Sequence, residues 1–398
     1  MLTILEIVSN PISWFSKYSC PYGGGEVRAF EILKEFLEMR NKILVLTSSR
    51  TSLFASLRNY KNFREIKVFT PSIVSKVEAI FSGFIWIMLT SLLFIAKKDL
   101  FLRYRICIAS NTNITDVLPA WLHHKLFHSK LIVVVQVTGF QKSFGMSFRR
   151  ARSFGIPFAW AMLFQLTNAL TLRLMKEASL LIAISEPIYK ELKTLGFEDQ
   201  KIVRSSMGVR LKEIPETPKK KTYLGVFIGR VEESKGIFDL LKAWAIVKSF
   251  EPSAKLIIIG SGSCLNRAKT WSRIHGLSEN VSFTGFVSGA KRFYLMSKAK
   301  LAILPSKGSE GFCLSVLEAL SCGLPVVCYD HPTIKDIFSS FKSVFLTPSG
   351  NIPLLAEEII RIAKKEDLEK ISNLARNEAS LFDWKNVARK ELRAILNC

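Results

Sequence analysis

The stretch Glu310-Gly-Phe-Cys-Leu-Ser-Val-Leu-Glu318 follows an apolar, strand-like run at residues 299–304 and opens a helix. A helix that begins where a strand ends has unpaired backbone N–H groups and directs the positive end of its dipole to that edge of the sheet. Such a position suits a pyrophosphate. The flanking glutamates can accept hydrogen bonds from hydroxyl groups, so the stretch suits a nucleotide-sugar. An isolated pair at this spacing is more often two solvated side chains, so the prediction depends on the surrounding sequence.

A second strand-to-helix turn carries two cations. The apolar run at residues 223–228 leads into Gly229 and Arg230, and Lys235 lies just before an expected helix at residues 237–249. The planar guanidinium of Arg230 can hold a phosphate through two parallel hydrogen bonds, and the ammonium of Lys235 acts as a point charge. This turn therefore complements the same diphosphate.

Two more strands end in glycine, where the backbone can approach a ligand closely. One leads to Gly262, and the other leads through a glycine to Phe286 and Val287. Strands mostly alternate with helices throughout residues 223–346. This alternation predicts a doubly wound α/β domain in which the strand ends meet one ligand site.

In this order, the motifs resemble those of the retaining glycosyltransferases of family four, which carry an E-x7-E motif and have the α/β GT-B fold. The resemblance is specific over most of residues 222–340 and weaker elsewhere, as at a glycine loop that ends in Gly24 and Gly25. It implies two Rossmann-like domains that face a central cleft. The implied parts are an acceptor-side domain at residues 1–205, a nucleotide-sugar donor domain at 206–380 and a crossover helix at 381–398 that packs back on the first domain.

The resemblance also implies roles for single residues. Arg230 and Lys235 would neutralise the diphosphate. Glu318 would hold the ribose, and Glu310 would hold hydroxyls of the donor sugar. Phe286 and Val287 would contact the base, and Gly24 and Gly25 would close over the diphosphate. The residues whose backbone would contact the donor are Gly229, Gly262, Gly311, Phe312, Cys313 and Leu314.

One departure from the family follows an expected strand at residues 131–137. The family commonly has a histidine there, near the transferred sugar, whereas this chain has Thr138, with Gln136 nearby. A threonine hydroxyl can hydrogen-bond a sugar but cannot carry a proton at neutral pH as imidazole does. The mechanism proposed for the family tolerates this, because the leaving phosphate takes the acceptor proton and catalysis comes from positioning and charge stabilisation. Thr138 is expected to orient the donor sugar.

Length and composition agree with two domains. The chain has 398 residues, of which 48% are hydrophobic, enough for two cores. Its seven cysteines are scattered with no C-x-x-C pair, which favours reduced thiols in the cytoplasm. Neither the five histidines nor any Asp-x-Asp pattern suggests a metal site, so neither metal nor another cofactor is expected.

The charge balance points to an anionic partner. Lys and Arg number 56 against 33 Asp and Glu, a formal net charge of +23, and no nucleic-acid-binding signature accompanies it. Residues 79–96 are uncharged and followed by two lysines. Residues 153–172 are uncharged, preceded by Arg149, Arg150 and Arg152 and followed by Arg173. Both are long enough to span a bilayer. If residues 79–96 crossed the bilayer, the glycine loop and Glu310 would lie on opposite sides of it. If both segments crossed, strands would be cut off from their sheet. We therefore expect core burial or an interfacial position at the inner face of the cell membrane.

The sequence as a whole predicts a retaining, metal-independent hexosyltransferase. The donor would be a UDP- or GDP-sugar, and the acceptor a lipid-linked molecule or a glycan. Alternatives are another GT-B enzyme, either a sugar phosphorylase or a nucleotide-sugar epimerase, and a non-catalytic relative that binds lipid or a partner. An NAD-dependent dehydrogenase is disfavoured because the run from Gly260 to Leu265 lacks the third glycine of the dinucleotide fingerprint.

Overall fold

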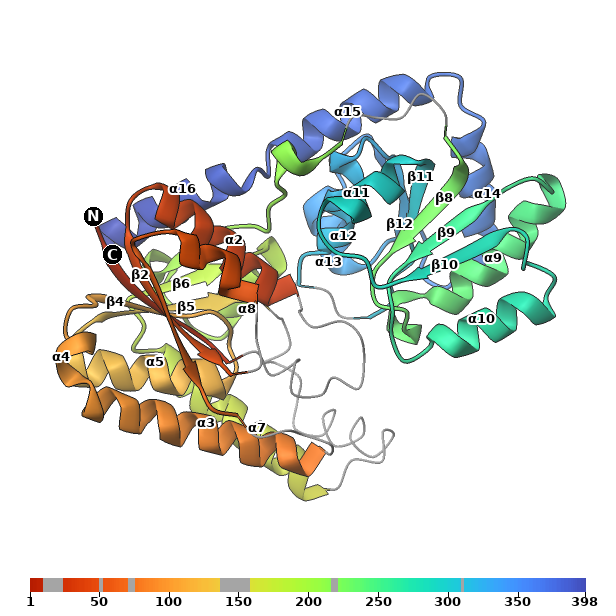
Figure 1. Ribbon diagram of the computed structural model, residues 1–398. Helices are drawn as coiled ribbons and strands as arrows, with labels where there is room; N and C mark the ends of the chain where they lie inside the picture. The colour runs from red at the N-terminus through yellow and green to blue at the C-terminus, as the bar shows by residue number, and fades with distance from the viewer. Residues whose placement is uncertain (10–23, 50–52, 71–75, 137–157, 216–220, 309–310) are drawn as a thin grey trace. The chain divides into compact units, whose positions relative to one another are not determined.

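The computed structural model describes residues 1–9, 24–49, 53–70, 76–136, 158–215, 221–308 and 311–398. Glu310 and Thr138 lie outside these residues, as do Arg149, Arg150 and Arg152. The chain forms two compact units (Figure 1). The first contains the described residues up to Ser206 together with Val387–Cys398, and the second contains Met207–Asn386.

The first unit is built on one parallel sheet of seven strands in the order β3-β2-β1-β4-β5-β6-β7. The inner strands are runs of Ile, Leu and Val that are buried almost throughout, as expected for a parallel sheet covered on both faces. The chain order reverses between β1 and β4, the position at which α/β sheets bind ligands. The strands are β1 (Thr3–Val8), β2 (Lys42–Ser48), β3 (Phe63–Val68), β4 (Ile106–Ala109), β5 (Lys130–Val135), β6 (Leu180–Ala183) and β7 (Ile202–Arg204).

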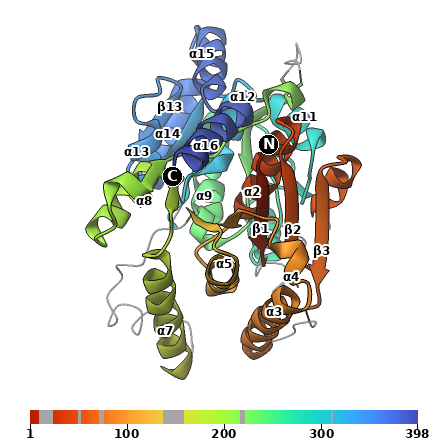
Figure 2. The same cartoon turned by 90° about the vertical axis from the view of Figure 1, so that its left-hand side faces the viewer.

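Helix α5 (Ile114–Phe127) packs on β1, β4 and β5 and also contacts α3 (Lys76–Ala96) and α7 (Phe158–Met175). Figure 2 shows α5 between these two longer helices. The other helices of this unit are α2 (Gly24–Glu38), α4 (Lys98–Phe101), α8 (Glu186–Thr194) and most of α16 (Trp384–Asn397), with short turns η1 (Leu53–Asn59) and η2 (Asp199–Lys201).

A buried ion pair joins α16 to α2. The guanidinium of Arg28 donates to the carboxylate of Glu391, which also accepts a hydrogen bond from Ser205. Both charged side chains are 2% exposed. Removing one partner from such a pair costs roughly 3–5 kcal/mol, because the other charge stays buried without compensation. This contact makes the last residues of the chain part of the first unit.

The second unit is built on a parallel sheet of six strands in the order β10-β9-β8-β11-β12-β13, with the reversal between β8 and β11. The strands are β8 (Tyr223–Ile228), β9 (Leu256–Ile259), β10 (Val281–Gly285), β11 (Ala299–Leu304), β12 (Val326–Tyr329) and β13 (Val344–Thr347). The helices are α9 (Ile237–Phe250), α10 (Leu265–Ile274), α11 (Ala290–Ser297), α12 (Leu314–Ser321), α13 (Pro332–Phe338), α14 (Ile352–Ala363) and α15 (Leu368–Ser380), with turns η3 (Leu211–Glu213) and η4 (Glu233–Lys235).

The chain enters and leaves the second unit at adjacent points. The N–H of Val209 donates to the carbonyl of Phe382 over 2.8 Å, and the N–H of Trp384 donates back to Val209 over 3.3 Å. A Cβ on Gly208 would lie 2.6 Å from the Trp384 ring, so no larger residue fits there. The two connecting segments are therefore tied together.

Candidate functional site

The candidate site is the carboxyl edge of the second sheet, around the reversal between β8 and β11. Glycines allow neighbouring strand ends to touch there. A Cβ on Gly260, whose φ is 146°, would lie 1.9 Å from the carbonyl oxygen of Gly229, and a Cβ on Gly262 would lie 2.6 Å from the carbonyl oxygen of Val231. Packing between the turns after β8 and β9 alone therefore requires glycine at Gly260 and Gly262, whether or not a ligand approaches the backbone there.

The turns after β8 and β11 are joined by their backbones. The N–H groups of Lys307 and Gly308 both donate to the carbonyl of Ser234 over 2.8 Å. Gly236 has a φ of 71°, and a Cβ on it would lie 1.9 Å from the carbonyl oxygen of Pro305. The segment that carries Lys235 and the segment that leads to Glu310 therefore hold each other in place.

A buried carboxylate strengthens this junction. Asp239, in the first turn of α9, accepts from Lys307 Nζ over 3.0 Å and from the Tyr329 hydroxyl over 2.9 Å. Its two oxygens thereby connect α9 to the turn after β11 and to β12. Asp239 is 7% exposed, so loss of either partner would leave a poorly solvated charge. Sequence reasoning missed it, since a single aspartate on an apolar helix matches no motif.

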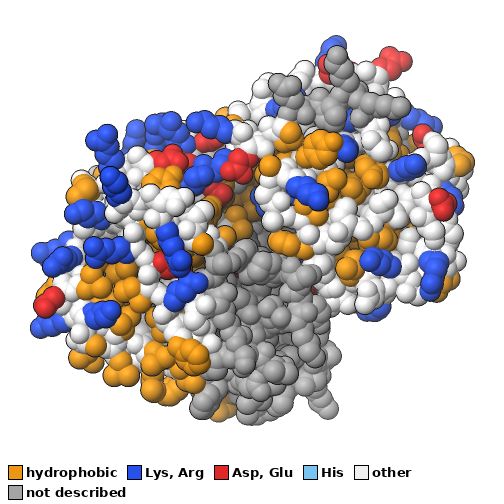
Figure 3. All heavy atoms as spheres, viewed as in Figure 1, with side chains coloured by type: hydrophobic (Ala, Val, Ile, Leu, Met, Phe, Trp, Pro, Cys, Tyr) orange, Lys and Arg blue, Asp and Glu red, His pale blue; other side chains and the backbone are white. Residues whose placement is uncertain are grey.

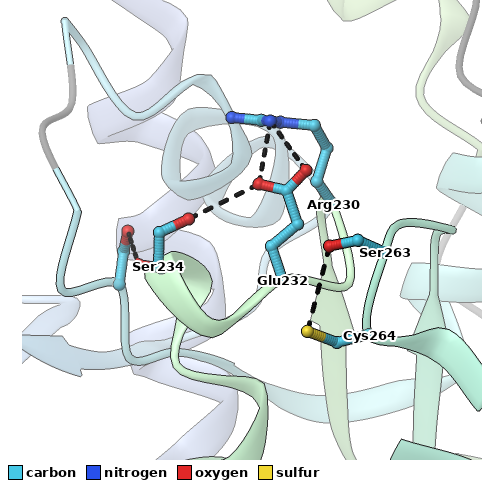
Figure 4. A network of polar contacts seen from close by, with 6 residues as sticks. Arg230, Glu232, Ser234, Ser263 and Cys264 are labelled. Carbon is cyan, nitrogen blue, oxygen red and sulfur yellow. Dashed lines mark hydrogen bonds and ion pairs between the residues drawn. The ribbon is translucent and has the colours of Figure 1, made fainter. Parts of the chain in front are cut away.

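Arg230 lies at the surface directly after β8, with its side chain 56% exposed. Its guanidinium is 2.8 Å from a carboxylate oxygen of Glu232, which also accepts from Ser234 over 3.5 Å (Figure 4). An exposed ion pair of this kind contributes about 0–1 kcal/mol, so a phosphate can displace Glu232 at little cost. Lys235 is half-buried at the end of η4, on the same turn.

Glu318 is buried on α12 and paired with a cation that the sequence analysis did not identify. One of its carboxylate oxygens is 2.7 Å from the guanidinium of Arg292, which comes from α11. Burial raises the pKa of Glu318, and the charge of Arg292 opposes that effect. This pair ties α11 to the middle of α12. No spacing rule pairs these two residues, because they lie on different helices.

The start of α12 offers backbone rather than side chains. Phe312 is 4% exposed, and its ring packs 5.9 Å from those of Phe338 and Phe382. Cys313, the residue before the helix, has a φ of 65°, which is unusual for a residue with a Cβ. Phe312 is thus anchored in the core directly before α12, and contact between the backbone of residues 311–314 and an anion stays a prediction.

The residues expected at the base lie on the same edge, after β10. Phe286 is 40% exposed and Val287 is half-exposed. The predicted site residues of the second unit thus follow the carboxyl ends of β8, β9, β10 and β11, except Glu318, which lies in the middle of α12, and Glu310, which lies outside the described residues.

In the first unit, the predicted glycine loop meets Gln136. A Cβ on Gly25, at the start of α2, would lie 2.6 Å from the Gln136 carboxamide oxygen. The carboxamide nitrogen of Gln136 donates to the carbonyl of Ser110 over 2.5 Å. Gln136 therefore connects the ends of β4 and β5 to α2 and is buried. Gly24 begins the same helix, and Thr138 is outside the described residues.

Two buried acids lie under this edge and were also missed. Ser110 donates to Glu6 on β1, and burial raises the pKa of Glu6 to about 8. Asp116 on α5 accepts from the N–H of Ser9 over 2.8 Å, and burial raises its pKa to about 7. Within the described part of the chain, no group of three or more His, Cys, Asp or Glu side chains is placed to hold a metal ion.

Comparisons with known proteins bear on this site. A family model described as glycosyl transferases group 1 matches residues 210–379, which include the whole second sheet. Phosphatidyl-myo-inositol mannosyltransferase of Mycobacterium leprae is 28% identical over 193 residues, 47% of this chain and 51% of that protein. The putative colanic acid biosynthesis glycosyltransferase WcaL of Salmonella typhimurium is 23% identical over 234 residues, 56% of this chain and 58% of that protein. The chain thus spans about half the length of the curated relatives it matches.

The fold has a solved counterpart. A crystal structure of Anabaena HepE in complex with UDP and glucose is similar with a TM-score of 0.76 and 16% identity, covering 100% of both chains. The likeness shows the fold, so the expected GT-B architecture of two Rossmann-like domains with parallel sheets is confirmed. The family match and the names of the relatives support a GT-B glycosyltransferase.

Proposed function

We propose that the protein is a retaining glycosyltransferase that moves a hexose from a nucleoside-diphosphate sugar to a lipid-linked or glycan acceptor. The observation that carries the proposal is that Arg230, Lys235 and the start of α12 follow the carboxyl ends of the neighbouring strands β8 and β11, with Glu318 buried on the same α12. These elements lie within the segment that matches the glycosyltransferase family model.

In this mechanism the second unit binds the donor. Arg230, Lys235 and the N–H groups at the start of α12 take the two phosphates, since cations and a helix dipole stabilise the charge that develops on a departing diphosphate. Glu318 holds the ribose hydroxyls. Phe286 and Val287 contact the base, for which uracil is the first candidate because HepE is complexed with UDP.

The chemical step exchanges one bond at the anomeric carbon. The bond to the diphosphate oxygen breaks, and the acceptor hydroxyl oxygen bonds to the same face of the sugar. The acceptor proton passes to the leaving phosphate, so no protein nucleophile or metal is required. Glu310 and Thr138 would hold the sugar hydroxyls during this step, which makes them positioning groups in the proposed reaction. Gly24 and Gly25 would close over the diphosphate, and the acceptor would be met at the inner face of the cell membrane.

A nucleotide panel tests the donor site. UDP, GDP, ADP and their hexose derivatives would be compared by thermal shift, where a ligand at a hundred times its dissociation constant stabilises by about 2.7 kcal/mol. Arg230→Gln should lose most of the shift. The matched control is Arg361→Gln, which removes an arginine that is also half-exposed and ion-paired, here with Glu358 on α14. Equal losses in both variants, or no shift with any nucleotide, would contradict the assignment.

The reaction itself is tested with the nucleotide-sugar that gives the largest shift. Transfer of labelled hexose to a membrane lipid extract or to oligosaccharides, with retained anomeric configuration, is the expected result. A new sugar epimer formed without any acceptor would instead identify an epimerase, and a dependence on inorganic phosphate as acceptor would identify a phosphorylase.

A further inference from the structure

Helix α3 buries two of its polar residues and exposes four of its large apolar residues. Ser82 and Thr90 are 0% exposed, and neither hydroxyl has a hydrogen-bond partner among the described residues. A helix between a protein core and water has the opposite arrangement. The exposed residues recur every three or four positions and so form one stripe: Phe84 (59% exposed), Met88 (45%), Leu92 (55%) and Ile95 (70%).

Contacts on the inner side fix this orientation. Trp86 is fully buried, and its indole N–H donates to the carbonyl of Thr115 over 2.9 Å. Phe94 is fully buried as well, with its ring edge-to-face at 4.8 Å from Phe101 and at 5.4 Å from His123. Rotating α3 to hide the stripe would expose both aromatic side chains. The apolar stripe is therefore held outward by the core itself.

Helix α7 repeats the pattern. Thr171 is buried, with its hydroxyl bonded to the carbonyl of Thr167 over 2.8 Å, while leucines and a methionine face outward. Both helices pack against α5, which lies between them (Figure 2). We call the combined stripes the α3–α7 apolar face, and Figure 3 shows hydrophobic side chains gathered over α3 at the lower left. On α7 the exposed residues are Met162, Leu163, Leu166 and Leu170.

Cations border this face. Lys97, Lys98 and Arg103 are exposed just after α3, and Arg173 and Lys176 are exposed at the end of α7. With a net charge of +23, two copies of the chain repel each other, which disfavours a second copy as the occupant. An anionic bilayer supplies an apolar interior for the stripes and negative headgroups for the cations. No helix of the described residues is long and apolar enough to cross a membrane.

We propose that the α3–α7 apolar face seats this protein on an anionic lipid bilayer, with both helices lying at the interface and the bordering cations among the headgroups. This deepens the membrane part of the proposed function and rests on that function only for the nature of the acceptor. The two uncharged segments singled out in the sequence thus acquire a specific arrangement: one side of each helix belongs to the core and the other to lipid.

Vesicle flotation tests the proposal. The intact protein should bind vesicles of equal phosphatidylglycerol and phosphatidylcholine and bind pure phosphatidylcholine much more weakly. Leu92→Glu combined with Leu166→Glu should lower the partition coefficient at least tenfold, because each change places a charge where an apolar side chain meets lipid. The matched control is Phe250→Glu with Ile274→Glu, which alters residues that are 69% and 71% exposed in the second unit, and it should bind like the original protein.

The cations are tested separately. Lys97→Gln with Lys98→Gln should weaken vesicle binding about fivefold for each charge removed. Added salt should also weaken vesicle binding. Bound vesicles should also slow amide hydrogen exchange in residues 84–96 and 162–173 and leave exchange in the second unit unchanged.

Two results would overturn the proposal. One is vesicle binding by the Leu92 and Leu166 variant equal to that of the original protein. The other is absence of vesicle binding together with a dimer in solution that this variant converts to a monomer, which would make the face a protein interface. A nucleotide thermal shift in the same variant separates the two proposals, because the donor site lies in the other unit. Vesicle binding without any nucleotide shift would leave the membrane proposal standing and remove the enzymatic one.

Discussion

Replacing Glu318 by Gln should weaken nucleoside diphosphate binding about 10- to 150-fold. This range corresponds to the roughly 1.5–3 kcal/mol of a hydrogen bond to a charged group, which the carboxylate would make to the ribose hydroxyls. Gln keeps the size of the side chain, so packing around α12 should change little. Calorimetric titration with UDP and GDP measures the effect directly.

A change to the ligand separates the loss of ribose recognition from a loss of binding caused by a disturbed structure. With 2′,3′-dideoxy-UDP the hydroxyls are missing, so Glu318→Gln and the original protein should bind it with similar affinity. The control variant Glu358→Gln removes a glutamate that is also paired with an arginine, on α14, and should leave both affinities unchanged. Unchanged UDP affinity in Glu318→Gln, or an equal loss with the dideoxy ligand, would refute the ribose assignment.

The partner of Glu318 gives a second measurement. Glu318→Gln and Arg292→Gln should each lower the free energy of unfolding by about 1–3 kcal/mol. This is less than for a fully buried pair, because 27% of the Arg292 side chain is exposed to water. Arg292→Gln also removes the charge that opposes the effect of burial, so the pKa of Glu318 should rise further. As pH is lowered, its UDP affinity should then begin to fall at a higher pH than that of the original protein, because the carboxylate takes up a proton sooner.

The remaining predictions concern the junction, the buried acids and metal. Gly236→Ala should lower the free energy of unfolding, measured with urea, by at least about 2 kcal/mol more than Gly276→Ala does. Both glycines have φ near 70°, but only at Gly236 would the new Cβ meet backbone. Equal effects of the two changes would show that the Pro305 contact is unimportant. Glu6 has a pKa of about 8 in the folded protein and about 4.5 unfolded, so the free energy of unfolding should fall by up to about 1.4 kcal/mol per pH unit as pH rises between these values, and Glu6→Gln should reduce that slope in pH-dependent melts. Transfer activity should persist in excess EDTA, and a complete loss restored by Mg²⁺ or Mn²⁺ would contradict the metal-independent mechanism.

Much of the fold could be read along the chain. The predicted strands at residues 223–228 and 299–304 coincide with β8 and β11. These mostly apolar runs stop at Gly229 and Pro305, and such signals depend only on neighbouring residues, which is why the prediction succeeded there. The edge strands β3 and β7 were not predicted. Phe63–Val68 contains three charged residues, and Ile202–Arg204 is too short for a pattern.

The candidate site was predictable where its residues follow strands directly. Arg230 and Lys235 follow β8, and parallel strands bring their carboxyl ends to one edge whatever the details of the fold, whereas Glu318 was singled out by its spacing from Glu310 and lies within α12. The groups that support them were not predictable. The pairs Glu318–Arg292 and Asp239–Lys307 join elements that become neighbours only after the sheet has assembled in its non-sequential order.

The same distinction applies to α3. The sequence determines that residues 79–96 are uncharged and apolar, and nothing in a nearly uniform apolar run tells which side of a helix will be buried. Tertiary packing decides this, because Trp86 and Phe94 find partners on α5 and α4 while Ser82 and Thr90 are carried inward beside them. Local sequence sets which elements form, whereas long-range contacts set which face of each element the solvent or a membrane meets.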